Sequence, residues 1–90
     1  MKLLWTRQGW DDYLYWQGVD AKMVSRINEL IRDMRRSLFQ GIGKPEPLRN
    51  ELSGWWARRI TQEHRIVYRV TGSGEAQAIE VTGCPFRYLR

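Results

Sequence analysis

The stretch from Gly41 to Arg69, GIGKPEPLRNELSGWWARRITQEHRIVYR, contains the pattern that determines the fold class. It begins as a loop rich in glycine and proline, and it ends in two short segments in which apolar and polar residues alternate. Such alternation predicts an antiparallel hairpin that packs one face on a core and leaves the other in solvent. We therefore expect this stretch to supply both a sheet and the functional groups.

The alternation assigns each residue of the hairpin to a face. The core side would consist of Trp56, Ile60, His64, Ile66, Tyr68 and Val70. The solvent side would consist of Ala57, Arg59, Thr61, Glu63, Arg65, Val67 and Arg69. The only histidine thus shares a face with apolar residues, which favours a structural role over a catalytic one. The other face displays the two arginines at 59 and 65.

Upstream of this stretch lies the clearest helical pattern of the chain. Apolar residues recur at helical spacing, namely Val24, Ile27, Leu30, Ile31, Met34 and Leu38. Charged residues occupy the opposite side, namely Arg26, Glu29, Arg32, Asp33 and Arg36. The spacing predicts an amphipathic helix of about five turns that docks on the sheet.

Three further elements are predicted nearer the ends of the chain. Lys2–Thr6 is expected to be a strand buried on both faces, and Leu48–Leu52 a short strand. A first helix is expected from about Gln8 to Gln17, stopped by Gly18 and followed by Asp20 as the N-cap of the next helix. Its apolar face would consist of Trp10, Tyr13 and Leu14.

The hairpin is expected to be followed by a turn at Gly72–Gly74 and a last strand at Ala76–Val81. The order of elements is then one strand, two helices and a β-meander, which is an α+β fold. Ninety residues without repeats or linkers suffice for a single small domain, residues 1–90.

Composition limits the classes of partner and compartment. The formal net charge is +5 and the pI is about 9.9, which favours an anionic partner such as nucleic acid, a membrane surface or an acidic protein. Cys84 is the only cysteine, so an intramolecular disulfide is excluded. One cysteine and one histidine are too few ligands for a His/Cys zinc site. The first residues lack the long apolar run of a signal peptide, and we expect a cytoplasmic protein.

Glu46 is the candidate catalytic carboxylate. It stands between Pro45 and Pro47, whose fixed φ angles limit the entropy that the loop loses on ordering. Arginines such as Arg49 and Arg65 bind phosphate bidentately and stay charged. These residues alone are compatible with a surface-loop glutamate, a nucleic-acid-binding domain or a ribonuclease.

Four segments carry a resemblance to a known family: KLLWTRQGWDDYLYWQ, RINELIRDMRR, GKPEPL and LSGWWARRITQEHRIVYRV. They closely resemble the YoeB toxins of the RelE/ParE superfamily. The resemblance implies a small microbial-ribonuclease-like fold, an antiparallel sheet with the two N-terminal helices packed on one face, in a single toxin domain. It also implies the toxin of a type II toxin–antitoxin system, an endoribonuclease that enters the ribosomal A site and cleaves mRNA.

The resemblance also implies roles for individual residues. Glu46 would act as general base on the ribose 2′-hydroxyl, and Arg65 would stabilise the charge that builds on the phosphate. The residues expected to bind RNA are Lys44, Arg49 and Arg59. The products would be a 2′,3′-cyclic phosphate and a free 5′-hydroxyl, and neither metal nor cofactor is expected to take part.

The C-terminal tail departs from the family pattern. YoeB toxins usually end in His-Tyr, whereas Arg87 and Tyr88 stand at those positions here. Arginine is a poor general acid because it does not readily lose its proton, so Arg87 would act as an electrostatic stabiliser. Tyr88 would stack on or orient a base.

The family further implies macromolecular partners. They are mRNA and the ribosome, a YefM-type antitoxin, operator DNA bound through the antitoxin complex, and a second copy of the toxin. Two alternatives stay open: a non-cleaving ParE-like inhibitor of DNA gyrase, and a DNA-binding corepressor that acts with its antitoxin.

Overall fold

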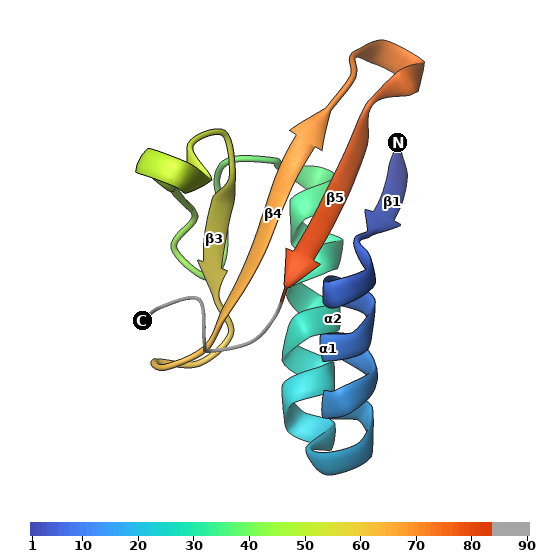
Figure 1. The fold of residues 1–90 in the computed structure, drawn as a ribbon, viewed down its shortest axis with the longest axis vertical. Coiled ribbons are helices and arrows are strands. Elements are labelled where there is room, and N and C mark those ends of the chain that lie inside the picture. The colour runs from blue at the N-terminus through green and yellow to red at the C-terminus, as the bar shows by residue number, and fades with distance from the viewer. Residues whose placement is uncertain (84–90) are drawn as a thin grey trace.

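The computed structural model describes residues 1–83, and within them a five-stranded sheet carries two helices on one face (Figure 1). The strands are β1 (Lys2–Trp5), β2 (Glu46–Pro47), β3 (Trp56–Arg59), β4 (Arg65–Thr71) and β5 (Ala78–Gly83). The helices are α1 (Arg7–Val19) and α2 (Ala21–Arg36), and two 3-10 turns are η1 (Asn50–Leu52) and η2 (Gly74–Ala76). The strand order is β1-β5-β4-β3-β2. This is the predicted α+β fold, with β1 parallel to β5 and the other pairs antiparallel.

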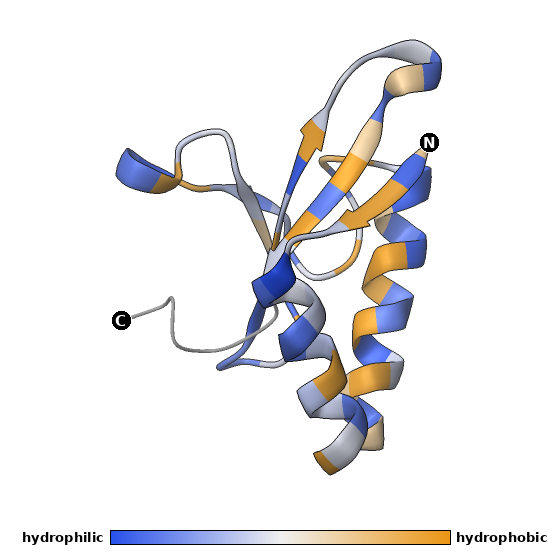
Figure 2. Cartoon of the chain, turned by 45° about the vertical axis from the view of Figure 1, so that its right-hand side comes forward, coloured by the Kyte–Doolittle hydropathy of each residue, from blue (hydrophilic) through white to orange (hydrophobic). Residues whose placement is uncertain are grey.

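The core lies between α2 and the inward face of β4 and β5. Its fully buried members include Ile27, Leu30 and Met34 from α2 and Ile66, Tyr68, Ile79 and Val81 from the strands. Figure 2 shows the apolar residues recurring along α2 between hydrophilic ones, as the helical spacing predicts. Fully burying one such apolar side chain contributes about 1.5–3 kcal/mol.

The prediction for the first strand is wrong in one respect. β1 pairs with β5 at the edge of the sheet, and its burial alternates instead of being complete. Leu3 and Trp5 pack against the core, whereas Leu4 is 43% exposed. The helices cover only one face of the sheet, so an apolar run at its edge is buried on that face alone.

The first helix differs from its prediction at its end and in its buried face. It continues through Gly18, and Asp20 closes α1 with its N–H while its carboxylate accepts from the first N–H groups of α2. Asp20 is thus the predicted N-cap and also the true end of α1. The buried residues of α1 are Gly9, Asp12 and Trp16, whereas Trp10 and Leu14 are each 44% exposed.

Close contact with β5 explains which face of α1 is buried. A Cβ at residue 9 would collide with the Val81 carbonyl oxygen, so glycine there lets the helix backbone approach the strand. The Thr6 side chain caps α1 at the Gly9 N–H and reaches the Thr82 carbonyl oxygen, 3.2 Å away.

No helix within residues 1–83 is long and apolar enough to cross a membrane.

Three other boundaries differ from the prediction. The expected strand Leu48–Leu52 is wrong, because Asn50 adopts a left-handed φ of 59° and begins η1. Pairing with β3 occurs earlier, at Glu46–Pro47. The last strand starts at Ala78 because η2 occupies residues 74–76. The second helix ends at Arg36, before Leu38.

Gly43 and Gly18 provide a matched test of backbone conformation. Gly43 has φ +80°, and an added Cβ would lie 2.7 Å from Cδ2 of Leu30. Gly43→Ala should lower the free energy of unfolding by about 2 kcal/mol or more, because strain and overpacking add. Gly18→Ala meets no atom within 4 Å and should raise stability by up to about 1 kcal/mol. Urea denaturation measures both; equal midpoints for the two variants would contradict this account of Gly43.

Candidate active site on the open face of the sheet

The face of the sheet opposite the helices, here called the open face, carries the predicted catalytic groups. In the ladder Glu46 pairs with Ala57, Ala57 with Val67, and Arg59 with Arg65. Residues directly opposite each other in a ladder project to the same side, as do residues two apart along a strand. Glu46, Arg59 and Arg65 therefore lie together on the open face.

The register places Glu46 and Arg59 on a diagonal of neighbouring strands. Such diagonal neighbours are separated by about 7–8 Å, which long side chains can span. Both side chains are exposed, whereas the partners Ala57 and Val67 are only 2% and 3% exposed. Glu46, Ala57 and Val67 form one row across β2, β3 and β4, here called the Glu46 row. Solvent therefore reaches this row mainly at Glu46.

Arg65 is oriented by the turn between β3 and β4. Its Nη1 donates to the carbonyl oxygens of Thr61, Gln62 and His64 at 3.1, 3.0 and 3.2 Å. These bonds hold the positive charge at the end of the hairpin. The His64 ring lies toward the helices, with its centroid 5.3 Å from that of Trp16, as expected for a structural histidine.

The other predicted RNA-binding groups flank Glu46 along the chain. Lys44 is exposed and adopts a left-handed φ of 50°, and Arg49 is exposed immediately before η1. Arg87 and Tyr88 lie outside the described residues 1–83.

Arg58 is the residue that the sequence analysis missed. Its side chain is fully buried, and its five N–H groups have five acceptors. Nε donates to the Tyr68 hydroxyl at 3.1 Å, and Nη1 to Asp33 Oδ2 at 2.7 Å. The remaining acceptors are the carbonyl oxygens of Ile42, Ser37 and Gln40, at 3.2, 2.6 and 2.8 Å. Its position between Trp56 and Ile60 in the alternation was the available signal, since it places a charge on the core side.

Asp33 and Tyr68 complete this buried network. Asp33 was predicted on the solvent side of its helix, which is wrong: its side chain is 14% exposed and also accepts from the Ile42 N–H at 3.0 Å. The hydrogen bond from Arg58 lowers the pKa of Asp33. The Tyr68 hydroxyl donates to the Leu38 carbonyl oxygen at 2.9 Å, and burial raises its pKa.

The network fixes the loop that leads to Glu46. Residues 37–42 are tied by their own backbone groups to side chains from α2, β3 and β4. One residue later the Gly43 carbonyl oxygen accepts from the Arg59 N–H at 2.6 Å, and pairing of β2 with β3 begins at Glu46. The position of the carboxylate thus depends on a buried arginine as well as on the packing of Leu38 and Ile42 against the core.

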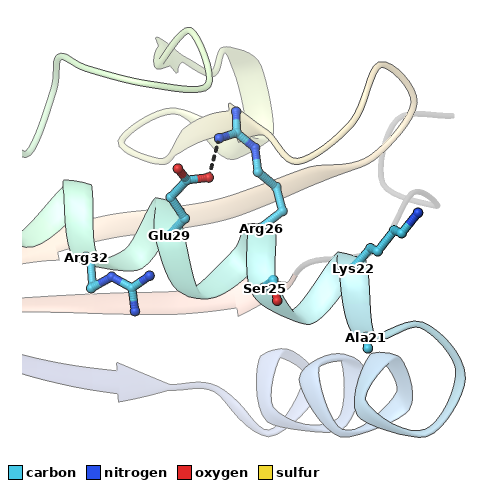
Figure 3. A pocket seen from close by; sticks show the side chains of 6 residues that line it. All are labelled: Ala21, Lys22, Ser25, Arg26, Glu29 and Arg32. Carbon is cyan, nitrogen blue, oxygen red and sulfur yellow. Dashed lines mark hydrogen bonds and ion pairs between the residues drawn. The ribbon is translucent and has the colours of Figure 1, made fainter.

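A surface hollow beside α2 is separate from these groups (Figure 3). It is lined by Ala21, Lys22, Ser25, Arg26, Glu29 and Arg32. Arg26 and Glu29 form an ion pair of 2.8 Å whose side chains are 34% and 56% exposed, and such pairs contribute little. Within residues 1–83, no cluster of three or more His, Cys, Asp or Glu side chains could hold a metal ion.

Comparison with known proteins identifies the family. Residues 5–88 match the model of the YoeB-like toxins of bacterial type II toxin–antitoxin systems. The chain belongs to this family. It is 53% identical to the YoeB toxin of Escherichia coli K12 over 88 residues, which cover 98% of this chain and all of that toxin. YoeB toxins belong to the RelE/ParE superfamily and are ribosome-dependent mRNA interferases, so the predicted family and function are confirmed.

Solved structures agree with the sequence relatives. A YoeB/ParE toxin from Agrobacterium tumefaciens is 58% identical and superposes with a TM-score of 0.91, covering 96% of this chain and 98% of that one. The YoeB toxin of Staphylococcus aureus, 39% identical, has been solved as a dimer and in a heterotetramer with YefM. Those two structures cover 96% of this chain and 95% of theirs, with TM-scores of 0.84 and 0.85. The fold described above is therefore that of a YoeB toxin.

Replacing Arg58 should destabilise the toxin more than replacing its neighbour. Arg58→Met leaves the Asp33 carboxylate and the loop carbonyl groups without their donor, and breaking a buried pair in this way costs about 3–5 kcal/mol. Arg59→Met removes an exposed arginine and should change stability by less than about 0.5 kcal/mol. Chemical denaturation of the two variants measures this; similar losses would show that the Arg58 network contributes nothing special.

The lowered pKa of Asp33 predicts a dependence of stability on acid. A carboxylate whose native pKa lies below its unfolded value, 3.8, stabilises the fold above that pH. Its contribution is lost as the pH falls through the native pKa. Asp33→Asn should therefore flatten the loss of stability between about pH 5 and 2, whereas Asp11→Asn, on exposed α1 surface, should keep the wild-type slope. Measuring the free energy of unfolding across this pH range tests the prediction. Parallel curves for the wild type and both variants would refute the assignment of this acid dependence to Asp33.

Proposed function

We propose that this toxin cleaves mRNA in the ribosomal A site by metal-independent attack of a ribose 2′-hydroxyl on the adjacent phosphate. The bond from phosphorus to the 5′-oxygen breaks, leaving a 2′,3′-cyclic phosphate and a free 5′-hydroxyl. The observation that carries the proposal is the presence of Glu46, Arg59 and Arg65 on one face of the sheet, with the Glu46 loop held by buried hydrogen bonds.

Each group has a role suited to its chemistry. Glu46 accepts the proton of the 2′-hydroxyl, and Arg65 stabilises the negative charge that develops on the phosphoryl oxygens. Arg59 binds a neighbouring phosphate of the substrate. Lys44 and Arg49 bind RNA backbone on either side of β2.

The tail residues act where the 5′-oxygen leaves. Arg87 and Tyr88 stand where the family usually has His-Tyr, and they lie outside the described residues. Because an arginine does not release a proton readily, Arg87 stabilises the charge on the departing 5′-oxygen, which takes its proton from water, and Tyr88 stacks on or orients a base. A reaction without a good general acid is slower by up to about 10²–10⁴.

The partners follow from the target and from the relatives. The S. aureus toxin forms a heterotetramer with YefM, and we propose that a YefM-type antitoxin neutralises this toxin and carries the complex to operator DNA. Dimerisation of the free toxin is proposed from the S. aureus dimer. A ribosomal target requires action in the cytoplasm, and we propose that residues 1–90 act as one toxin domain.

Mapping of mRNA 5′ ends on programmed ribosomes tests the proposal. Wild type should cut within the A-site codon and leave 3′ ends that carry a cyclic phosphate. Glu46→Ala should lower the cleavage rate by about 10²–10⁴, and Arg65→Ala by about 10²–10³. Glu29→Ala and Arg26→Ala, which remove the same residue types from the hollow on α2, should cut like wild type.

Each outcome separates one alternative. Absence of any A-site cut by the wild type would favour a non-cleaving gyrase inhibitor or corepressor. Cutting that survives both Glu46→Ala and Arg65→Ala would instead overturn the assignment of these residues.

A further inference from the structure

A row of side chains next to Glu46 has no part in the proposed cleavage chemistry. The Leu48 N–H donates to the Trp55 carbonyl oxygen at 2.9 Å, and Arg69 pairs with Glu80. Because Trp56 pairs with Tyr68, Trp55 stands opposite Arg69. Trp55, Arg69 and Glu80, here called the Trp55 cluster, therefore form one row across β4, β5 and the residue that precedes β3.

The three side chains of this cluster are held together by direct contacts. Cζ of Arg69 lies 4.5 Å from the centroid of the Trp55 ring. Nε of Arg69 lies 2.7 Å from Oε1 of Glu80. The side chain of Arg69 is nevertheless 45% exposed, and that of Glu80 22%. The cluster is therefore ordered but open to solvent.

The geometry suits stacking. A guanidinium is planar, so one face can lie on an indole while the other accepts a second flat group. The ion pair with Glu80 restrains the flexible arginine over the ring, which reduces the entropy that a ligand would have to remove. Exposed ion pairs contribute little to stability by themselves, so the arrangement is poorly explained as a stabilising contact.

We propose that the Trp55 cluster is a stacking site for a nucleobase of RNA. The choice of RNA rests on the proposed function, whereas the choice of a base rests on the cluster itself. Trp55 is a diagonal neighbour of Glu46, at about 7–8 Å, on the side opposite Arg59. A base stacked there belongs to the same short stretch of RNA as a phosphate held by the arginine pair.

Charge decides between a base and a phosphate. Glu80 compensates the charge of Arg69, and its carboxylate would repel a phosphate oxygen. A base needs only a flat, polarisable surface, and stacking on aromatic or guanidinium planes is the usual way proteins hold unpaired bases. Within residues 1–83, neither Arg59 nor Arg65 forms an ion pair with a carboxylate, so phosphate belongs on their side.

Binding of a fully 2′-O-methylated single-stranded RNA tests the proposal, because such RNA cannot be cleaved by 2′-hydroxyl attack. Trp55→Leu should weaken binding by about 5- to 100-fold. Arg69→Lys keeps the charge but loses the planar face on which the base lies, and should weaken binding by at least a similar factor. Trp10→Leu, at a tryptophan that is 44% exposed on α1, is the matched control and should bind like wild type. Thermal melts of each variant identify loss of fold.

Two further measurements identify the chemical group. Replacing one nucleotide by an abasic one should weaken binding to wild type but not further weaken binding to Trp55→Leu. The magnitude of the slope of the logarithm of the RNA-binding constant against the logarithm of salt concentration should stay unchanged in Arg69→Met. In Arg59→Ala it should fall by about one. A fall of about one in Arg69→Met would mean that Arg69 binds phosphate, and would overturn the proposal.

The base can come from mRNA or from rRNA, and cleavage on the ribosome distinguishes these sources. If Trp55→Leu slows cutting of intact mRNA but not of mRNA abasic beside the cut, the base belongs to mRNA; equal slowing assigns it to rRNA. If Trp55→Leu binds RNA like Trp10→Leu and instead weakens binding of antitoxin, the surface serves a protein and the proposal fails. Because the binding assay needs neither ribosomes nor cleavage, a toxin that cuts no mRNA would leave its result intact.

Discussion

The buried guanidinium of Arg58 is the interaction on which the rest of the structure depends. A charge in a protein interior is tolerated only when it is paired and its hydrogen bonds are satisfied. Here five acceptors surround it, and they come from α2, the loop of residues 37–42 and β4. Leu38 and Ile42 of this loop pack against the core, and the network adds hydrogen bonds that fix the loop backbone. The position of the Glu46 carboxylate depends on the position of this loop.

Two adjacent arginines show how strictly the strand separates structure from chemistry. Arg58 and Arg59 are neighbours in β3, yet one is fully buried and the other exposed. Successive side chains of a strand point to opposite faces, so a shift of register by one residue would exchange their environments. The pairing of Arg59 with Arg65, and of Glu46 with Ala57, is thus maintained by the same contacts that bury Arg58.

Periodicity predicted what depends on neighbours in sequence, and it failed where distant contacts decide. The helical stripe from Val24 to Met34 and the core side of the hairpin follow from spacing alone. The expected exposure of Ala57 and Val67 is wrong, because they are only 2% and 3% exposed. The partial exposure of Leu4 depends on the edge position of β1, and Asp33 is drawn inward by an arginine 25 residues away. Arg58 itself shares its face with Trp56 and Ile60, so a charge in that position required a buried partner, which sequence cannot name. For Arg59 and Arg65 the sequence located the shared face, whereas the place of Glu46 on that face depends on the pairing of β2 with β3, which the sequence did not predict.

The open face is divided by charge, and this division bears on how it can bind RNA. On one side of the Glu46 row, Arg59 and Arg65 pair in the ladder, and like charges directly opposite each other repel. An anion between them relieves that repulsion, so this side gains most from a phosphate. On the other side, Glu80 neutralises Arg69 while Trp55 covers one of its faces, which leaves a flat surface with little net charge. A nucleotide has the same division into an anionic and a flat aromatic part. A strand of RNA that places its phosphate on the first side and its base on the second would leave the ribose between them, next to the carboxylate of Glu46.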